Sequence, residues 1–269
     1  MLRKNQSVSI DRSFESMRKG DMVIKAIARI RSDYTEKFGI PRQSGLVPEL
    51  TAEVVFEPEY RDIEALRGIE GFSHLWLIWE FSEVRRRGKA AKELRQDLNN
   101  CEDDRTHILP DWSPTVRPPR LGGNERLGVF ATRSPFRPNP IGLSCVRIEE
   151  IDFHTIDGPV IRVSGADLMN GTPIFDIKPY IPYADAHPEA LGGFTSSRAF
   201  EKVQVVVEPE AARKMRKEEL EELRSVLEQD PRPAYKRGEN KTYRFSFAEY
   251  EIEFTSDERG ITVTDCIKR

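Results

Sequence analysis

The chain has 269 residues and a formal net charge of −3, from 42 Lys+Arg and 45 Asp+Glu. A protein that coats nucleic acid through bulk charge would be far more basic, so any contact with nucleic acid must use local patches. With 38% hydrophobic and 32% charged residues, the chain can bury a core and is not disordered throughout. Short uncharged runs, no visible secretory signal and three scattered cysteines predict a cytoplasmic protein.

Residues 1–21 are predicted to be a flexible leader, and short apolar segments bounded by Gly, Pro and Asn follow. Seven of them are predicted strands: 22–30, 50–56, 73–81, 126–132, 142–151, 160–166 and 174–179. One short helix is expected near 62–67. Many strands with few helices predict a mainly β fold, an antiparallel barrel or a sandwich. The run 75–79 is apolar throughout, which predicts a strand buried on both faces.

The segment 85–111 is predicted to be a helical insertion, with a helix at 88–100. Its start is strongly basic, and the residues concerned are Arg85, Arg86, Arg87 and Lys89. Two interpretations stay open for this run. It is either a solvated surface helix or an electrostatic arm that binds a polyanion such as RNA.

A second unit follows a linker at 187–200 and is predicted to be a small α+β domain, residues 201–269. Its expected order is a strand at 202–207, an amphipathic helix at 210–229 and three strands at 242–247, 250–254 and 261–267. The helix is expected to end at Asp230-Pro231, because proline cannot continue the hydrogen-bond ladder and restricts the residue before it.

Common catalytic signatures are absent: there is no P-loop, no G-x-S-x-G, no H-E-x-x-H and no Rossmann glycine fingerprint. The four scattered histidines make a metal site improbable. Four loops rich in Gly, Pro and Arg stand out instead, and they are FGIPRQSG (38–45), VRPPRLGG (116–123), TRSPFRPNPIG (132–142) and DLMNGTP (167–173). Arginines in stiff loops are suited to carboxylate or phosphate, so together the loops predict a pocket for a small anionic or zwitterionic ligand.

These loops, with GIEGFSHLWLIWEFSE before them and DIKPYIPYAD after them, resemble the TsaA-like (TrmO, YaeB) family over about residues 22–186. DPRPAYKRGENKTYRF (230–245) resembles the second domain of its bacterial members. The resemblance implies a β-barrel with a small appended domain. It also implies a homodimer that uses S-adenosylmethionine to methylate N6 of a threonylcarbamoylated adenosine 37 in the anticodon loop of tRNA.

The resemblance also implies site residues. The cofactor would be bound by Pro41, Arg42, Gln43, Ser82, Glu83, Arg133, Leu143, Asp167, Leu168, Met169 and Asn170. For Leu143, Leu168 and Met169, core packing is an equally good interpretation.

Methyl transfer from a sulfonium needs mainly in-line alignment of nucleophile, carbon and sulfur, plus removal of the N6 proton. Asp176 and Asp185 are candidate proton acceptors, and Tyr180 could stack on the base or hydrogen-bond to its ureido group. A turn or an ion pair with Lys178 is an equal alternative for Asp176.

In the second domain, Arg232 and Tyr235 are candidate RNA contacts, since an arginine can hold phosphate and a tyrosine can stack on an unpaired base. On this interpretation the C-terminal domain serves the tRNA and the barrel serves the cofactor. The alternative is that Asp230-Pro231 only ends the helix and Tyr235 packs in the core of the small domain. Three hypotheses remain for the whole chain: a tRNA methyltransferase, a methyltransferase with another acceptor, and a non-catalytic module that binds RNA or senses S-adenosylmethionine.

Overall fold

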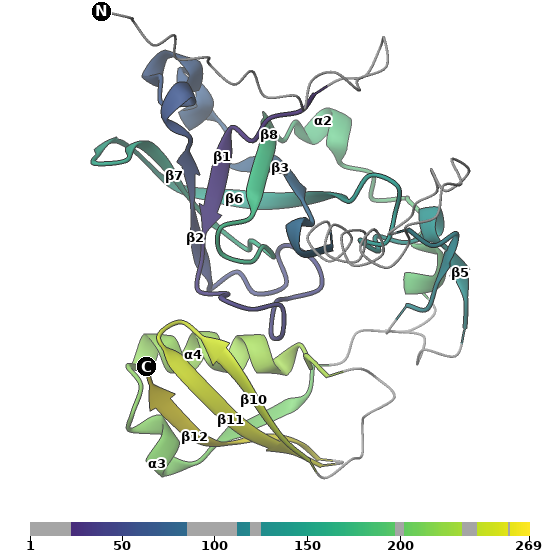
Figure 1. Ribbon diagram of the computed structural model, residues 1–269, viewed down its shortest axis with the longest axis vertical. Helices are drawn as coiled ribbons and strands as arrows, with labels where there is room; N and C mark the ends of the chain where they lie inside the picture. The colour runs from purple at the N-terminus through teal and green to yellow at the C-terminus, as the bar shows by residue number, and fades with distance from the viewer. Residues whose placement is uncertain (1–22, 85–111, 119–124, 197–201, 233–240, 258) are drawn as a thin grey trace, which may run out of the picture.

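A computed structural model describes residues 23–84, 112–118, 125–196, 202–232, 241–257 and 259–269. The predicted leader, the basic run (Arg85, Arg86, Arg87 and Lys89) and Tyr235 lie outside these ranges. Figure 1 shows two units, a β-barrel and a smaller unit of helices and a sheet that contains the C-terminus. Within the described residues, no helix is long and apolar enough to cross a membrane.

Six strands close the barrel in the order β1-β2-β7-β6-β3-β8, and every neighbouring pair is antiparallel. They are β1 (Ala28–Arg31), β2 (Thr51–Phe56), β3 (His74–Glu80), β6 (Ile141–Thr155), β7 (Gly158–Ser164) and β8 (Pro173–Pro179). The predicted mainly β, antiparallel barrel is thus confirmed. Strand β6 is the longest, and its first half pairs with β3 while its second half pairs with β7.

The interior of the barrel is filled by alternate side chains of its strands. On β3, Leu75, Leu77 and Trp79 are buried, whereas the intervening side chains are half-buried. The prediction that this strand is buried on both faces was therefore wrong, because one face is buried and the other is half-buried. A closed barrel has a single interior, and successive side chains of a strand point to opposite faces.

Two predicted strands of the barrel unit differ from the structure. The first strand is shorter than expected and begins at Ala28. Residues 126–132 contain only β5 (Leu127–Gly128), paired with β4 (Thr115–Val116), followed by a 3-10 turn, η6 (Val129–Ala131). The amide N–H of Thr132 donates to the carbonyl of Val129, which turns the chain out of the sheet.

The short helix expected near 62–67 is a 3-10 helix, η3 (Ile63–Leu66), whose cap residue Asp62 accepts from the N–H of Glu64. Two further 3-10 turns, η2 (Pro58–Tyr60) and η4 (Ile69–Gly71), flank it. After the barrel come α2 (Pro182–Asp185) and η7 (Gly193–Thr195).

The C-terminal unit is a four-stranded sheet in the order β10-β11-β12-β9, in which β9 runs parallel to β12. Its strands are β9 (Gln204–Val207), β10 (Lys241–Phe247), β11 (Tyr250–Ser256) and β12 (Gly260–Lys268). The predicted helix 210–229 is divided into α3 (Pro209–Ala212) and α4 (Lys217–Glu228). Helix α4 starts afresh because Glu219 accepts from the N–H of Arg216 at 3.0 Å, which forms a capping box.

Candidate cofactor and substrate site

The loop 38–45 is fixed against the barrel where β6 and β7 diverge. The N–H of Cys145 donates to Ser44 Oγ at 3.2 Å, and the N–H of Gly45 donates to the carbonyl of Gly165 at 2.8 Å. Both glycines have positive φ, and a Cβ on Gly165 would lie 3.0 Å from the Cα of Gly45. The sequence therefore needs glycine at this contact, where two backbones meet.

Two of the predicted cofactor residues come together at the end of this loop. Arg133 Nη1, in the loop that follows η6, donates to Gln43 Oε1 at 2.6 Å. The guanidinium keeps further N–H donors for a bound anion, since an arginine has five of them. The Arg- and Pro-rich loops 38–45 and 132–142 thus converge, as their composition predicted.

Asp167 ends a chain of hydrogen bonds that begins inside the barrel. Trp79 Nε1 donates to Ser144 Oγ at 2.9 Å, and that hydroxyl donates to Asp167 Oδ1 at 2.5 Å. Burial raises the pKa of Asp167, while the Ser144 hydrogen bond and the charge of Arg133 act against that rise. The Arg133 guanidinium and the Asp167 carboxyl group therefore share this site.

The sequence pattern predicts that Trp79 is buried, but it does not single out Ser144. The alternation of residues in β6 could have identified Ser144. Gly142, Ser144 and Val146 alternate on the buried face, so a hydroxyl stands where an apolar side chain is expected. A buried hydroxyl needs a hydrogen-bond partner, and Asp167 supplies it.

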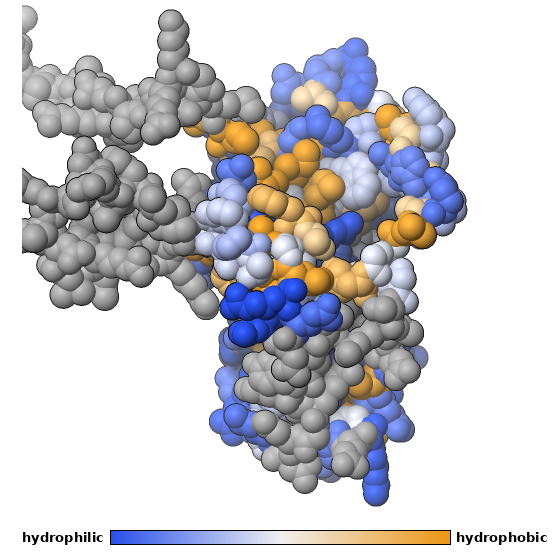
Figure 2. All heavy atoms as spheres, turned by 90° about the vertical axis from the view of Figure 1, so that its right-hand side faces the viewer, coloured by the Kyte–Doolittle hydropathy of each residue, from blue (hydrophilic) through white to orange (hydrophobic). Residues whose placement is uncertain are grey.

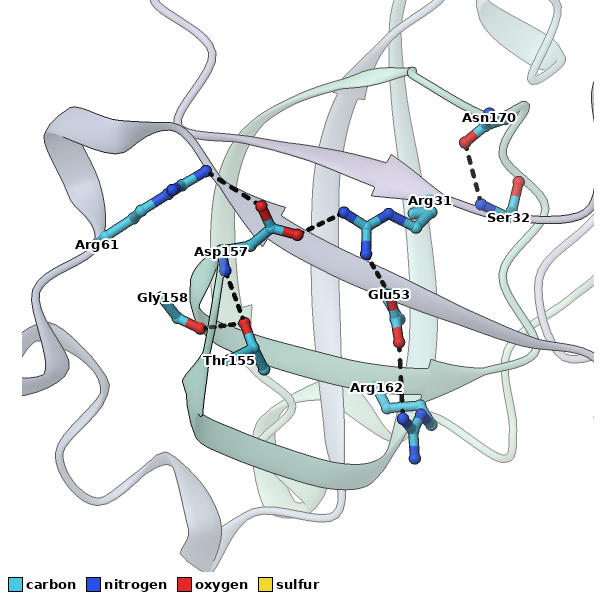
Figure 3. Close-up of polar contacts among 9 residues, drawn as sticks. All are labelled: Arg31, Ser32, Glu53, Arg61, Thr155, Asp157, Gly158, Arg162 and Asn170. Atoms are coloured by element: carbon cyan, nitrogen blue, oxygen red, sulfur yellow. Dashed lines mark hydrogen bonds and ion pairs between the residues drawn. The ribbon is translucent and has the colours of Figure 1, made fainter.

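Of the other predicted cofactor residues in the segment 167–170, Leu168 and Asn170 hold the backbone in place. The Leu168 side chain is buried in the barrel core, and its carbonyl accepts from Ser32 Oγ–H at 3.0 Å. Asn170 Oδ1 accepts from the N–H of Ser32 at 3.2 Å (Figure 3), and the N–H of Asn170 donates to the carbonyl of Tyr34. Met169 is half-buried.

Leu143 lies on the outer face of β6 and is 52% exposed, so core packing does not explain it. Exposed Phe130, Phe136 and Ile141 come from the preceding loop and the start of the same strand. Figure 2 shows hydrophobic residues gathered on the face of the barrel unit that lies on the right in Figure 1.

Ser82 and Glu83 form a helical turn directly after β3, and both are half-buried. The N–H of Phe81 donates to the carbonyl of Pro140 at 2.8 Å. This bond places the turn beside the loop 132–142, which carries Arg133.

Asp176 and Leu143 both lie opposite Ile78 in the register of β8, β3 and β6, so they share one row across the sheet. Asp176 Oδ2 also forms an ion pair with Lys178 Nζ at 2.8 Å. The ion-pair alternative is therefore present in the structure, and it leaves the carboxylate at half-buried depth next to the predicted site.

Asp185 accepts hydrogen bonds from Trp76 Nε1 at 3.1 Å and from the N–H of Ile181 at 2.8 Å. These bonds lower its pKa, which makes it a weak base. The ring of Tyr180 lies 5.9 Å from that of Trp76 and 6.1 Å from that of His74. Aromatic side chains therefore gather beside Asp185, one of the two predicted proton acceptors.

The prediction that Arg232 contacts RNA phosphate does not fit its position. The residue is 2% exposed, and its Nε and Nη2 donate to the two carboxylate oxygens of Asp230 at 2.7 and 3.3 Å. Asp230 adopts a positive φ that ends α4 and turns its carboxylate toward the arginine. The guanidinium is therefore buried in an ion pair with Asp230, and its role is structural.

A group of arginines on the outer wall of the barrel is balanced by carboxylates. Figure 3 shows Arg31 between Glu53 and Asp157, with Arg61 and Arg162 at the two ends of this network. The guanidinium of Arg31 lies 3.0 Å from Glu53 Oε2 and 2.7 Å from Asp157 Oδ2. Because each charge is paired, this wall offers little attraction to RNA phosphates.

Comparison with known protein families identifies the family of this chain. The model of the tRNA-methyltransferase O (TrmO) N-terminal domain matches residues 29–186, and the model of the TrmO C-terminal domain matches residues 200–269. The chain belongs to the tRNA-methyltransferase O family.

Its relatives in the TrmO family cover most of the chain. The tRNA (adenine(37)-N6)-methyltransferase of Escherichia coli is 38% identical over 88% of this chain and 94% of its own length. A candidate S-adenosylmethionine-dependent methyltransferase of Pseudomonas aeruginosa, RcsF, is also 38% identical, over 80% of this chain and 84% of its own length. The crystal structure of TrmO from P. aeruginosa superposes with a TM-score of 0.66 at 30% identity, and the match covers 91% of this chain and 98% of that one.

The residues at the site fit S-adenosylmethionine in their chemistry. The amino-acid end of this cofactor has a carboxylate, an ammonium and a sulfonium, so it calls for both a cationic and an anionic partner. Arg133, with Gln43 beside it, and the carboxyl group of Asp167 supply these two partners at one place. Exposed Leu143 supplies an apolar surface nearby.

Proposed function

We propose that the protein transfers a methyl group from S-adenosylmethionine to N6 of adenosine 37 in tRNA, beside the anticodon. The observation that carries the proposal is the convergence of Arg133, Gln43 and Asp167 at the edge of the barrel in a chain of this family. The names of relatives in E. coli and Eikenella corrodens support the same reaction.

The bound cofactor supplies an activated methyl group. The protein's residues then have two tasks, to orient the donor and to bring the acceptor nitrogen into line. Arg133 and Gln43 would hold the carboxylate end of the cofactor, and Asp167 would interact with its cationic end. Ser144 fixes Asp167 Oδ1, so the carboxylate keeps its direction.

The acceptor we propose is the threonylcarbamoylated form of adenosine 37, whose N6 proton is acidified by the adjacent carbonyl. Asp176 is our candidate for taking that proton, since it shares a row with Leu143 and has a water-accessible carboxylate. Asp185 already accepts hydrogen bonds from Trp76 and Ile181, so we assign it a positioning role and not that of the base. Tyr180, beside Trp76, offers a stacking surface for the base.

We further propose a cytoplasmic homodimer that binds the anticodon loop of tRNA. The exposed apolar side chains of Phe130, Phe136, Ile141 and Leu143 support a protein interface at the barrel edge. Such an interface would cover the cofactor site from outside and exclude water from it.

Calorimetry with S-adenosylmethionine tests the site. We expect Arg133→Ala to weaken binding by about 1.5–3 kcal/mol, the effect of losing a hydrogen bond to a charged group. Arg126→Ala is the matched control, because this arginine is exposed and its Nη1 donates to Thr115 Oγ1 at 2.8 Å instead. Equal affinity in Arg133→Ala and the wild type would show that the pocket lies elsewhere.

A further inference from the structure

The loop that carries Pro41, Arg42 and Gln43 is packed into the core of the C-terminal unit. The hydrophobic core of that unit includes buried Val47 and Leu50, and Phe38 and Ile40 pack against it. The barrel has a separate core. In Figure 1, α4 is the element of the C-terminal unit that faces the barrel loops.

An aromatic cluster anchors the start of this loop. The ring of Phe38 lies 5.6 Å from Phe245, 6.3 Å from Tyr243 and 6.3 Å from Phe254. Gly39 has a φ of +90°, and a Cβ at this position would lie 2.8 Å from Phe245 Cε2. Glycine is therefore needed both for the backbone conformation and for the approach of Phe245.

Polar contacts extend the same attachment to the middle of the loop. Arg42 Nη2 donates to the carbonyl of Arg232 at 2.9 Å, and Gln229 Nε2 donates to the carbonyl of Leu46 at 3.4 Å. The backbone around Arg232 is itself fixed by the buried ion pair with Asp230. The turn after α4 is thus a rigid support for the loop.

Gln43 lies between two attachments. On its N-terminal side, residues 38–42 are held by the C-terminal unit, and on its C-terminal side Ser44 and Gly45 are bonded to the barrel. Its side chain accepts from Arg133. A change that displaces residues 38–42 from the C-terminal unit would therefore alter the position of Gln43 relative to Arg133.

From this geometry we propose that the C-terminal domain is a positioning element of the cofactor site, with Phe245 and the Asp230–Arg232 turn holding the loop that presents Gln43 to Arg133. The proposal rests on the function proposed above. It revises the expectation that this domain serves the tRNA alone. A loop ordered in advance does not have to be ordered by the ligand, so binding is stronger.

The test compares two glycine variants in the full-length protein. In Gly39→Ala the new Cβ meets Phe245. In Gly68→Ala the backbone strain is the same, because φ is +88°, but no atom lies within 4 Å. We expect Gly39→Ala to weaken S-adenosylmethionine binding roughly tenfold and to raise KM for the cofactor, with KM for tRNA unchanged. Gly68→Ala should bind the cofactor like the wild type.

Phe245→Leu approaches the same contact from the C-terminal side and keeps the test decisive if Gly39→Ala does not fold. We expect weaker cofactor binding and unchanged tRNA binding. Because leucine lacks the ring atom that the new Cβ would meet, the double variant should lose less affinity than the two single losses combined.

Unchanged cofactor affinity in Phe245→Leu, or equal losses in the two glycine variants, would overturn the positioning role. Failure of the wild type to bind S-adenosylmethionine would instead overturn the proposed function. The two failures are therefore distinguishable.

Discussion

At the scale of single residues, the site depends on a glycine that makes room for a tryptophan. A Cβ at Gly142 would overlap the indole ring of Trp79, which donates to Ser144 and through it orients Asp167. The direction of the Asp167 carboxyl group is therefore set by side-chain packing within the barrel.

Gly142→Ala should lower the free energy of unfolding by about 1–3 kcal/mol, because the core has no space for the added methyl group. Denaturation in urea, followed by tryptophan fluorescence, measures the change. Gly128→Ala is the control, since a Cβ there has no neighbour within 4 Å. If both variants match the wild type in stability, the packing of Trp79 against Gly142 is not as described.

At the scale of elements, the carboxylates of helix α4 lie close to Asp33 in the segment after β1, and they outnumber the cations there. Burial, followed by the charges of Asp33 and Glu219, raises the pKa of Glu222 to about 7. Glu218 adds to this effect, and Arg216 opposes it. Glu222 is thus partly protonated near neutral pH in the folded protein, whereas in the unfolded chain it ionises near its ordinary value.

This difference predicts how stability depends on pH. Between the ordinary glutamate pKa and about 7, the folded state binds more protons than the unfolded state. The free energy of unfolding therefore decreases as pH rises through this range. Glu222→Gln should therefore be more stable than the wild type at pH 8 by about 1–2 kcal/mol and show a smaller decrease from pH 5 to 8.

Thermal unfolding at several pH values measures the effect. Glu221→Gln, at an exposed neighbouring position on α4, serves as the control. A wild type that becomes more stable relative to Glu222→Gln as pH rises would contradict the sign of this argument.

The elements also show what the sequence can and cannot predict. The strands β2, β3, β7 and β8 were predictable, because apolar residues in them are bounded by turn-forming residues. The convergence of loops 38–45 and 132–142 was predictable from their shared composition. Residues 126–132 were mispredicted because Val129 and Phe130 suit a strand, but hydrogen bonds in η6 turn the chain.

Long-range contacts could not be predicted from the sequence. The bond from Trp79 to Ser144 joins positions 65 residues apart, and it depends on the register of β3 and β6. The burial of Arg232 depends on the positive φ of Asp230, a conformation uncommon outside glycine. Local sequence patterns contain neither piece of information.

At the scale of the whole molecule, binding of a large polyanion must be explained for a chain with a net charge of −3. Our candidate RNA contacts remain Tyr235 and the basic run Arg85, Arg86, Arg87 and Lys89. Replacing the four cations by glutamine should lower the slope of log affinity against log salt by about 3–4 for tRNA, with S-adenosylmethionine affinity unchanged. Filter binding over a range of salt concentrations measures the slope, and an identical slope would return this run to a solvated surface.

The central claim is methylation of N6 of adenosine 37. It is tested most directly by mass spectrometry of tRNA nucleosides from cells that lack the gene, before and after the purified protein and S-adenosylmethionine are added. We predict that the N6-methylated, threonylcarbamoylated adenosine is missing before the addition and is restored by the wild-type protein, but much more slowly by Arg133→Ala. A modified nucleoside already present at the normal level in cells without the gene, or no methyl transfer by the wild type, would contradict the account.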